Sequence, residues 1–214
     1  RVDLVVELLN KGLVVEPLAL LYKDEVRQAG EALGLPHELV WRHPFPGPGL
    51  GVRTLCSDGS EAPVYSEAVE STAECARAEG FESMVLPVRS VGVQGDSRTY
   101  AHPALLLGEP DWDRIEQLST RITNSVAGVN RVVFGVQVAE SPRYTLQTAF
   151  VTRERLDLLR RIDDRVTTLL REHDLYDTIW QMPVILLPLV NADGDQCVVL
   201  RPVASREAMT ARFV

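Results

Sequence analysis

Apolar residues recur at helical spacing near the start of the chain. Between residues 18 and 33 they fall near the period of an α-helix, and Gly34 followed by Pro36 predicts that this helix ends at about Leu33. A short helical turn is expected through "HELVWR", residues 37–42.

Three further helices are expected downstream. A helical and acidic pattern covers residues 64–79, an amphipathic pattern covers 111–126, and a long helix covers about 152–172. The Arg- and Asp-rich face of the long helix is expected to be solvated. The apolar stripes of the last two helices consist of Ile115, Leu118 and Ile122, and of Leu156, Leu159, Ile162, Val166 and Leu169.

Strand patterns fill much of the space between these helices. "LGVRTL", residues 50–55, alternates as a strand does, residues 83–95 read as a strand followed by the turn "GDSR", and "NRVVFGVQV" at 130–138 is rich in β-formers. Residues 57–63, "SDGSEAP", read as a linker or an exposed loop.

The end of the chain resembles its middle. Leu86-Pro87-Val88 matches Met182-Pro183-Val184, and Gly95-Asp96 matches Gly194-Asp195. Repetition at roughly 95 to 100 residues indicates a duplicated αβ unit. The second copy lacks the closing helix and strand of the first, and two such copies would pack their sheets side by side or use them to dimerise.

Composition narrows the class of protein. The hydrophobic share of 45% and the charged share of 24% are those of a globular domain. A net charge of −8 argues against nucleic acid as a partner, although a local basic pocket for a phosphorylated small molecule stays open. No apolar run approaches the roughly 20 residues that span a bilayer, so no membrane partner and a cytoplasmic location are expected.

Cysteines and histidines give no sign of a metal site or a disulfide framework. Three cysteines are widely spaced without a CxxC pair, and four histidines are dispersed without HxxxH spacing. We therefore expect reduced thiols and no protein-bound metal.

One loop is unusually constrained. "HPFPGPGLGVR", residues 43–53, combines prolines that fix φ with glycines that let a ligand approach the backbone. It would form a preformed rim for an anionic substrate beside His43 and Arg53, or simply a rigid connection between domains.

Three other sites carry candidate chemistry, each with a plainer alternative. Lys23 and Asp24 of "KDEVR" lie near a helix start, where a phosphate contact or a salt-bridged surface would fit. Asp96 and Arg98 of "VGVQGDSR" follow a strand end, which places them in a ligand crevice or in a turn. Gln181 precedes an apolar strand. Its side chain would contact the edge of a nucleotide base, or the residue would simply begin the strand. None of these patterns names a reaction.

Taken together in their order, these motifs resemble the C-terminal half of glutamine-dependent GMP synthetases. The strings that carry the resemblance are "KDEVR", "HPFPGPG", "LPVRSVGVQGDSRTYAHP", "GVNRVVF" and "QMPVILLPL". The resemblance covers most of residues 12–214 and is weakest at 57–80. The duplicated unit resembles the long form of the family, whose dimerisation domain carries an extra copy.

The resemblance implies a ligase that adenylates XMP with ATP and Mg²⁺ and then aminates it with ammonia from a glutaminase domain. It implies XMP contacts at Asp96, Arg98 and Gln181, and phosphate or nucleotide contacts at Lys23, Asp24, His43 and Arg53. It also implies a homodimer. The family's pyrophosphate loop, glutaminase domain and C-terminal tail are absent from the 214 residues, so this chain alone is expected to be inactive.

We therefore expect an α/β fold. Residues 1–55 would be the tail of an adenine-nucleotide α-hydrolase-like ATP-pyrophosphatase domain, 56–140 the first αβ dimerisation unit, and 141–214 an incomplete second unit. Two alternatives stay open: a non-catalytic oligomerisation or regulatory module derived from this family, and another ATP-pyrophosphatase.

Overall fold

The computed structural model describes residues 2–44, 49–60, 64–94, 97–139, 142–205 and 212–214. Contacts divide the chain into two units. Unit 1 consists of residues 1–45, 171–182 and 202–214, and unit 2 of residues 46–170 and 183–201.

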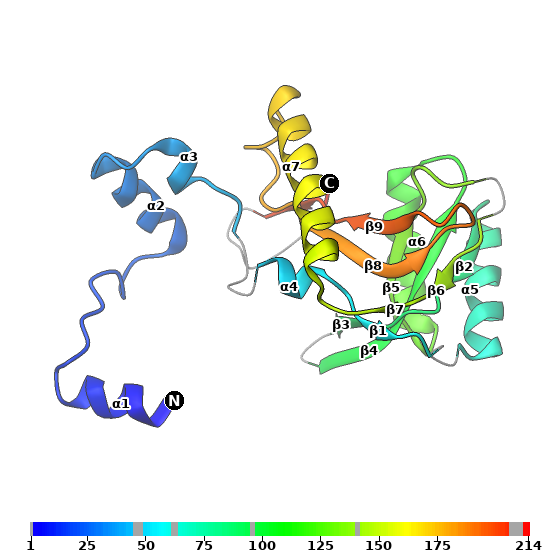
Figure 1. Ribbon diagram of the computed structural model, residues 1–214, viewed down its shortest axis with the longest axis horizontal. Helices are drawn as coiled ribbons and strands as arrows, with labels where there is room; N and C mark the ends of the chain where they lie inside the picture. Colours follow the sequence, from blue (N-terminus) through cyan, green and yellow to red (C-terminus); the bar gives the residue numbers. More distant parts are fainter. Residues whose placement is uncertain (1, 45–48, 61–63, 95–96, 140–141, 206–211) are drawn as a thin grey trace. The chain divides into compact units, whose positions relative to one another are not determined.

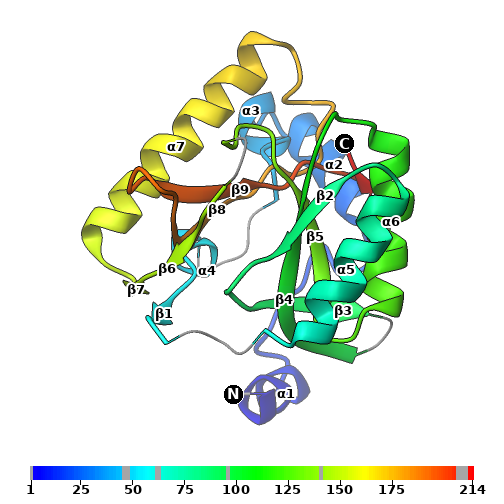
Figure 2. The ribbon, with the colours of Figure 1, turned by 90° about the vertical axis from the view of Figure 1, so that its right-hand side faces the viewer.

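Four strands form the first sheet of unit 2, with β4 (Ser97–Leu107) as its central strand. β2 (Glu82–Val85) and β3 (Ser90–Gln94) pair antiparallel with different stretches of β4, and β5 (Val129–Phe134) pairs with it in parallel. Helix α5 (Ser66–Ala78) precedes β2, and α6 (Trp112–Ser125) connects β4 with β5. Both helices cover the same face of this sheet (Figure 2).

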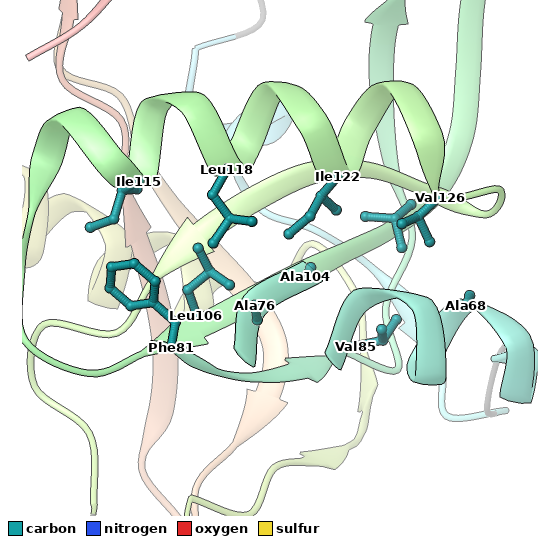
Figure 3. Close-up of a cluster of buried hydrophobic side chains, with 11 residues drawn as sticks. Ala68, Ala76, Phe81, Val85, Ala104, Leu106, Ile115, Leu118, Ile122 and Val126 are labelled. Atoms are coloured by element: carbon teal, nitrogen blue, oxygen red, sulfur yellow. The ribbon is translucent and has the colours of Figure 1, made fainter. Parts of the chain in front are cut away.

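A buried apolar cluster joins the first sheet to these two helices (Figure 3). Asp111 caps α6 by accepting a hydrogen bond from the Arg114 backbone N–H at 3.1 Å, which fixes the start of the helix. The spacing of the buried α6 residues then places them on one stripe. The cluster contains Ala68, Ala76, Phe81, Val85, Ala104, Leu106, Ile115, Leu118, Ile122, Val126 and Val129.

The opposite face of the first sheet packs against a second sheet. This sheet contains β6 (Thr145–Leu146), β8 (Val184–Val190) and β9 (Gln196–Leu200), all antiparallel. The layer between the sheets, here called the inter-sheet cluster, has a buried centre formed by Leu86, Val88, Leu105, Leu187 and Leu189. A separate short pair links β1 (Ser57–Asp58) with β7 (Thr148–Ala149).

Helix α7 (Arg153–Glu172) and the short helix α4 (Leu50–Arg53) cover the second sheet. Leu159 of α7 is fully buried with Val184 and Leu186 of β8, and Leu50 of α4 packs against them. Unit 2 is thus a four-layer α/β/β/α arrangement (Figure 2).

Unit 1 contains short helices and one small strand pair. Its helices are α1 (Val2–Asn10), α2 (Lys23–Ala32) and α3 (His37–Val40), and β10 (Val203–Ala204) pairs antiparallel with β11 (Arg212–Phe213) (Figure 1). Local polar contacts hold α2 and α3 together. Glu31 interacts with Nδ1 of His37 at 2.9 Å and accepts from Nε1 of Trp41 at 2.6 Å, and the Arg27 guanidinium lies 5.1 Å from the Trp41 ring centroid.

Most predicted elements are confirmed. The structure has the expected α/β fold, helices at 66–78, 112–125 and 153–172, and a short helix at 37–40. The first predicted helix begins later than expected, at Lys23, because residues 17–20 form turns. The strand predicted at 83–95 is two strands, since residues 86–89 leave the ladder between β2 and β3.

One prediction is wrong. Residues 50–53 form a helix instead of a strand, because Leu50 packs with Leu159 of α7; Thr54 makes a bridge to Leu186. The Arg- and Asp-rich face of α7 is exposed as predicted, at Arg160, Arg161, Asp164 and Arg165, whereas Arg155, on the side of the apolar stripe, is buried. Of the linker predicted at 57–63, Ser57 and Asp58 form β1, and residues 61–63 lie outside the described residues.

Replacing Leu118 by Ala is expected to lower the free energy of unfolding by about 2–5 kcal/mol, because the fully buried side chain would leave a cavity. Denaturant unfolding of unit 2 measures this. Leu20→Ala is the matched control, since that side chain is 96% exposed, and its effect should stay below about 0.5 kcal/mol. Equal losses in the two variants would contradict the packing described for α6.

Candidate functional site

An aromatic stack in unit 1 fixes the residues that enter the Pro/Gly loop. The rings of His43 and Tyr176 are parallel within 3°, with centroids 4.0 Å apart. The Arg171 guanidinium lies 4.9 Å from the same Tyr176 ring, within the range of a cation–π contact. The loop entrance is therefore attached to a segment more than 130 residues away in sequence.

Hydrogen bonds reinforce this stack. Nε2 of His43 lies 2.8 Å from the backbone oxygen of Tyr176, and the His43 backbone N–H donates to the Tyr176 hydroxyl at 3.3 Å. Because a carbonyl oxygen only accepts, the first contact requires the hydrogen to be on Nε2 of His43. The contact therefore selects one tautomer and one orientation of the imidazole ring.

Gln181 makes the next contact along the same stretch of chain. Its side-chain amide donates to the backbone oxygen of Pro44 at 2.7 Å. Its own backbone is held by a two-way bridge to Val203, with N–H···O distances of 3.2 and 2.9 Å. The backbone of Gln181 is thus held by Val203 while its side-chain amide holds Pro44. Gln181 therefore fixes the backbone immediately before residues 45–48.

The local fold explains how Tyr176 and Gln181 reach this position. Asp174 adopts a φ of 55°, a left-handed conformation that ends α7 and reverses the chain. Ile179 is buried and closes a turn with Leu175 through a backbone hydrogen bond of 3.2 Å. A compact segment at 173–181 thus presents both side chains to the loop entrance.

The structure brings together two of the residues predicted from sequence, His43 and Gln181. Arg98 is exposed on β4, and Asp96 lies outside the described residues, as do residues 45–48 of the loop. Tyr176 was not predicted as a site residue. The signal available for it was the "LYD" that follows the long helix, an aromatic-acidic pair that the internal repeat shares.

Arg53 has a partner already. Its guanidinium donates twice to Asp163 of α7, at 2.5 and 3.2 Å, and the Arg53 side chain is only 6% exposed. A bidentate pair of this kind fixes α4 against α7. This contact favours a structural role, and a phosphate contact at Arg53 stays a prediction.

Lys23 and Asp24 lie in the exposed first turn of α2. A helix start favours anions, but this one already carries Asp24 and Glu25, and Glu25 accepts from the Tyr22 N–H at 2.8 Å. The Lys23 ammonium suits a phosphate and the Asp24 carboxylate suits a hard cation such as Mg²⁺. Within the described ranges no group of three or more His, Cys, Asp or Glu side chains could hold a metal ion.

In the described part of the chain, no helix has the length and apolar character needed to cross a bilayer.

Comparison with known proteins places this geometry in context. No family model matches the chain. A probable glutamine-hydrolysing GMP synthase of Leptospira interrogans is 40% identical over 216 residues, which covers all of this chain and 36% of the relative. The GMP synthase of Corynebacterium jeikeium is 46% identical over 147 residues, covering 58% of this chain and 27% of the relative. That of Mycobacterium tuberculosis is 42% identical over 158 residues, covering 64% and 30%.

The fold is that of a mixed α/β segment, and the chain spans roughly a third of the length of these curated relatives. Along its whole length the chain is homologous to a probable glutamine-hydrolysing GMP synthase. The resemblance predicted from the motifs is therefore confirmed.

Replacing Tyr176 by Leu is expected to destabilise the loop entrance, because the stack on His43 and the hydroxyl acceptor are both lost. The stacking component alone corresponds to about 0.5–1.5 kcal/mol. Proton NMR of the His43 ring measures it directly, since stacking on Tyr176 shifts the ring protons upfield and this shift should disappear.

Tyr176→Phe is the matched control. It keeps the ring over His43 and removes only the 3.3 Å hydrogen bond, so the upfield shift should persist. An unchanged His43 spectrum in Tyr176→Leu would show that the stack does not form in solution.

Proposed function

We propose that this chain is the C-terminal segment of a glutamine-hydrolysing GMP synthase and that it supplies XMP binding and dimerisation. The observation that carries the proposal is the 40% identity to a probable GMP synthase across the entire chain. In the whole enzyme, ATP and Mg²⁺ would activate XMP by adenylation, and ammonia from a glutaminase domain would displace AMP to give GMP.

Residues 1–55 would close the ATP-pyrophosphatase domain, residues 56–140 would form the first dimerisation unit, and residues 141–214 would begin a second. Homodimerisation and a cytoplasmic location are part of the proposal. The glutaminase domain would be fused or separate, and the chain by itself would not catalyse the reaction.

The purine monophosphate would meet the protein at the Pro/Gly loop, Asp96, Arg98 and Gln181. Gln181 supports this assignment in a specific way, because its amide holds the Pro44 carbonyl directly before the loop. A loop fixed at its entrance loses little conformational entropy when a ligand binds. Gln181 would therefore contribute to XMP affinity by ordering the loop as well as by any contact of its own.

His43 would act on the same loop through its stack on Tyr176. Lys23 and Asp24 would lie near the ATP phosphates, and Arg53 would support the loop from its other end through its pair with Asp163. In this enzyme class the protein's contribution to adenylyl transfer is mainly positioning and charge stabilisation. A stiff loop is suited to that task.

Calorimetric titration of the chain with XMP and with ATP separately tests the proposal. We expect XMP to bind and ATP not to bind, because the chain holds no pyrophosphate loop. Absence of XMP binding would refute XMP binding by this chain and would leave the non-catalytic oligomerisation module as the better description.

In the complete enzyme, Gln181→Ala and Asp96→Ala should each raise the KM for XMP by about tenfold, the effect of one lost hydrogen bond to a charged or buried group. Glutamine hydrolysis without XMP should stay close to the parent rate. Gln137→Ala is a matched control, since that glutamine is exposed on the chain after β5. An unchanged KM for XMP in both test variants would overturn the site assignment.

A further inference from the structure

The ribbon formed by β3 and β4 extends beyond the part of the first sheet in which β4 has neighbours on both sides. β2 pairs with residues 104–107 of β4, and β5 pairs with residues 102–106. In the described part of the chain, residues 97–101 of β4 pair only with β3. A two-stranded ribbon is marginally stable in water by itself. Its paired residues Val91 and Tyr100 are 53% and 66% exposed, so apolar burial contributes little at this pair.

A bulge on β5 directs one polar side chain at this ribbon. His102 and Pro103 follow each other on β4, whereas their partners on β5, Val129 and Arg131, are two residues apart. Asn130 is therefore the extra residue of a β-bulge and has no residue opposite it on β4. A bulge changes the direction of the side chain that it carries, and bulges are common beside active sites.

The Asn130 side chain links β5 with both strands of the ribbon. Its Nδ2 donates to the backbone oxygen of Ser90 on β3 at 2.8 Å and to Thr99 on β4, whose backbone oxygen and hydroxyl lie 3.3 and 3.2 Å away. Its Oδ1 accepts from the Ser90 hydroxyl at 3.2 Å. Asn130 is buried, and polar groups of a buried network are costly to leave without partners. These bonds therefore fix the ribbon against β5.

The sequence of β3 leaves space for this side chain. Gly92 pairs with Thr99, and a Cβ atom at Gly92 would lie 2.9 Å from Cβ, Cγ and Nδ2 of Asn130, which is closer than such atoms can approach. Gly92 does not have a positive φ, so its backbone conformation does not require glycine. A glycine weakens the interior of a strand and often marks a close approach by another group. Here that group is the Asn130 amide.

We propose that Asn130 is a positioning residue for XMP, which acts through the β3–β4 ribbon on Arg98. This inference rests on the proposed function, in which Arg98 contacts XMP. Thr99, which Asn130 holds, directly follows Arg98, and Arg98 pairs with Val93 on β3. Asn130 does not touch the substrate; it fixes the backbone from which the exposed Arg98 projects. A ribbon that is held before binding loses less conformational entropy when the ligand binds.

Hydrogen exchange in the complete enzyme tests the anchoring of the ribbon without XMP. Asn130→Ala and Gly92→Ala should each speed exchange of the backbone amides in residues 90–94 and 97–101 by about tenfold or more, because a ribbon without its anchor opens more often. Exchange in α6 should stay as in the parent. Asn124→Ala is the matched control, since that asparagine is exposed at the end of α6.

Steady-state kinetics of the same variants test the positioning role. Asn130→Ala and Gly92→Ala should each raise the KM for XMP about fivefold, whereas the KM for ATP and glutamine hydrolysis without XMP should stay close to the parent values. In an Arg98→Ala background, Asn130→Ala should raise the KM for XMP no further, because its effect passes through Arg98. A role in stability alone would lower kcat through a smaller folded fraction and leave the KM for XMP unchanged.

The outcomes separate this inference from the proposed function. Unchanged exchange in the ribbon would overturn the inference, and so would additive effects of Asn130→Ala and Arg98→Ala. An unchanged KM for XMP in Asn130→Ala, beside a raised one in Arg98→Ala, would overturn it and leave the proposed function intact. An unchanged KM in Arg98→Ala would refute the assignment of Arg98 to XMP and this inference with it. Circular dichroism checks folding, and Gly92→Ala carries the test if Asn130→Ala does not fold, since it keeps the amide.

Discussion

Burial of strand β4 on both faces is the constraint on which unit 2 depends. Ala104 and Leu106 face α5 and α6, while Leu105 between them faces the second sheet. A strand that is apolar on both sides cannot lie at a surface, so it requires a helical layer on one face and a further layer on the other. A shift of one residue in its pairing would exchange the two faces, and the bulge between His102 and Pro103 adjusts the register with β5.

This arrangement also buries charged side chains between α4, α7 and the second sheet. The second sheet brings α7 close enough for Asp163 to meet Arg53 and for Arg155 to reach three backbone oxygens. Both of these contacts strengthen the fold.

The entrance of the Pro/Gly loop depends on a different interaction, the parallel stacking of the His43 and Tyr176 rings. The prolines in this stretch of sequence restrict φ, but a restricted φ does not fix the direction in which the chain enters the loop. The stack, the Gln181 amide and the bridge between Gln181 and Val203 attach its entrance to a segment from near the other end of the chain. Anchoring of the loop entrance would favour the nucleotide binding proposed above, because ordering the binding residues in advance lowers the entropic cost of binding a ligand.

The sequence by itself determined the long helices, the α/β class and the family. Periodicity of 3.6 residues in 111–126 and 152–172 reports burial along one stripe, and the motifs around His43 and Gln181 are specific strings. Only the tertiary structure decided that Leu50 joins a helix, that Arg155 is buried, and that Tyr176 stacks on His43. Each of these three outcomes involves at least one partner 100 or more residues away in sequence. A local pattern of residues carries no information about which distant groups will lie close enough to override the local propensity.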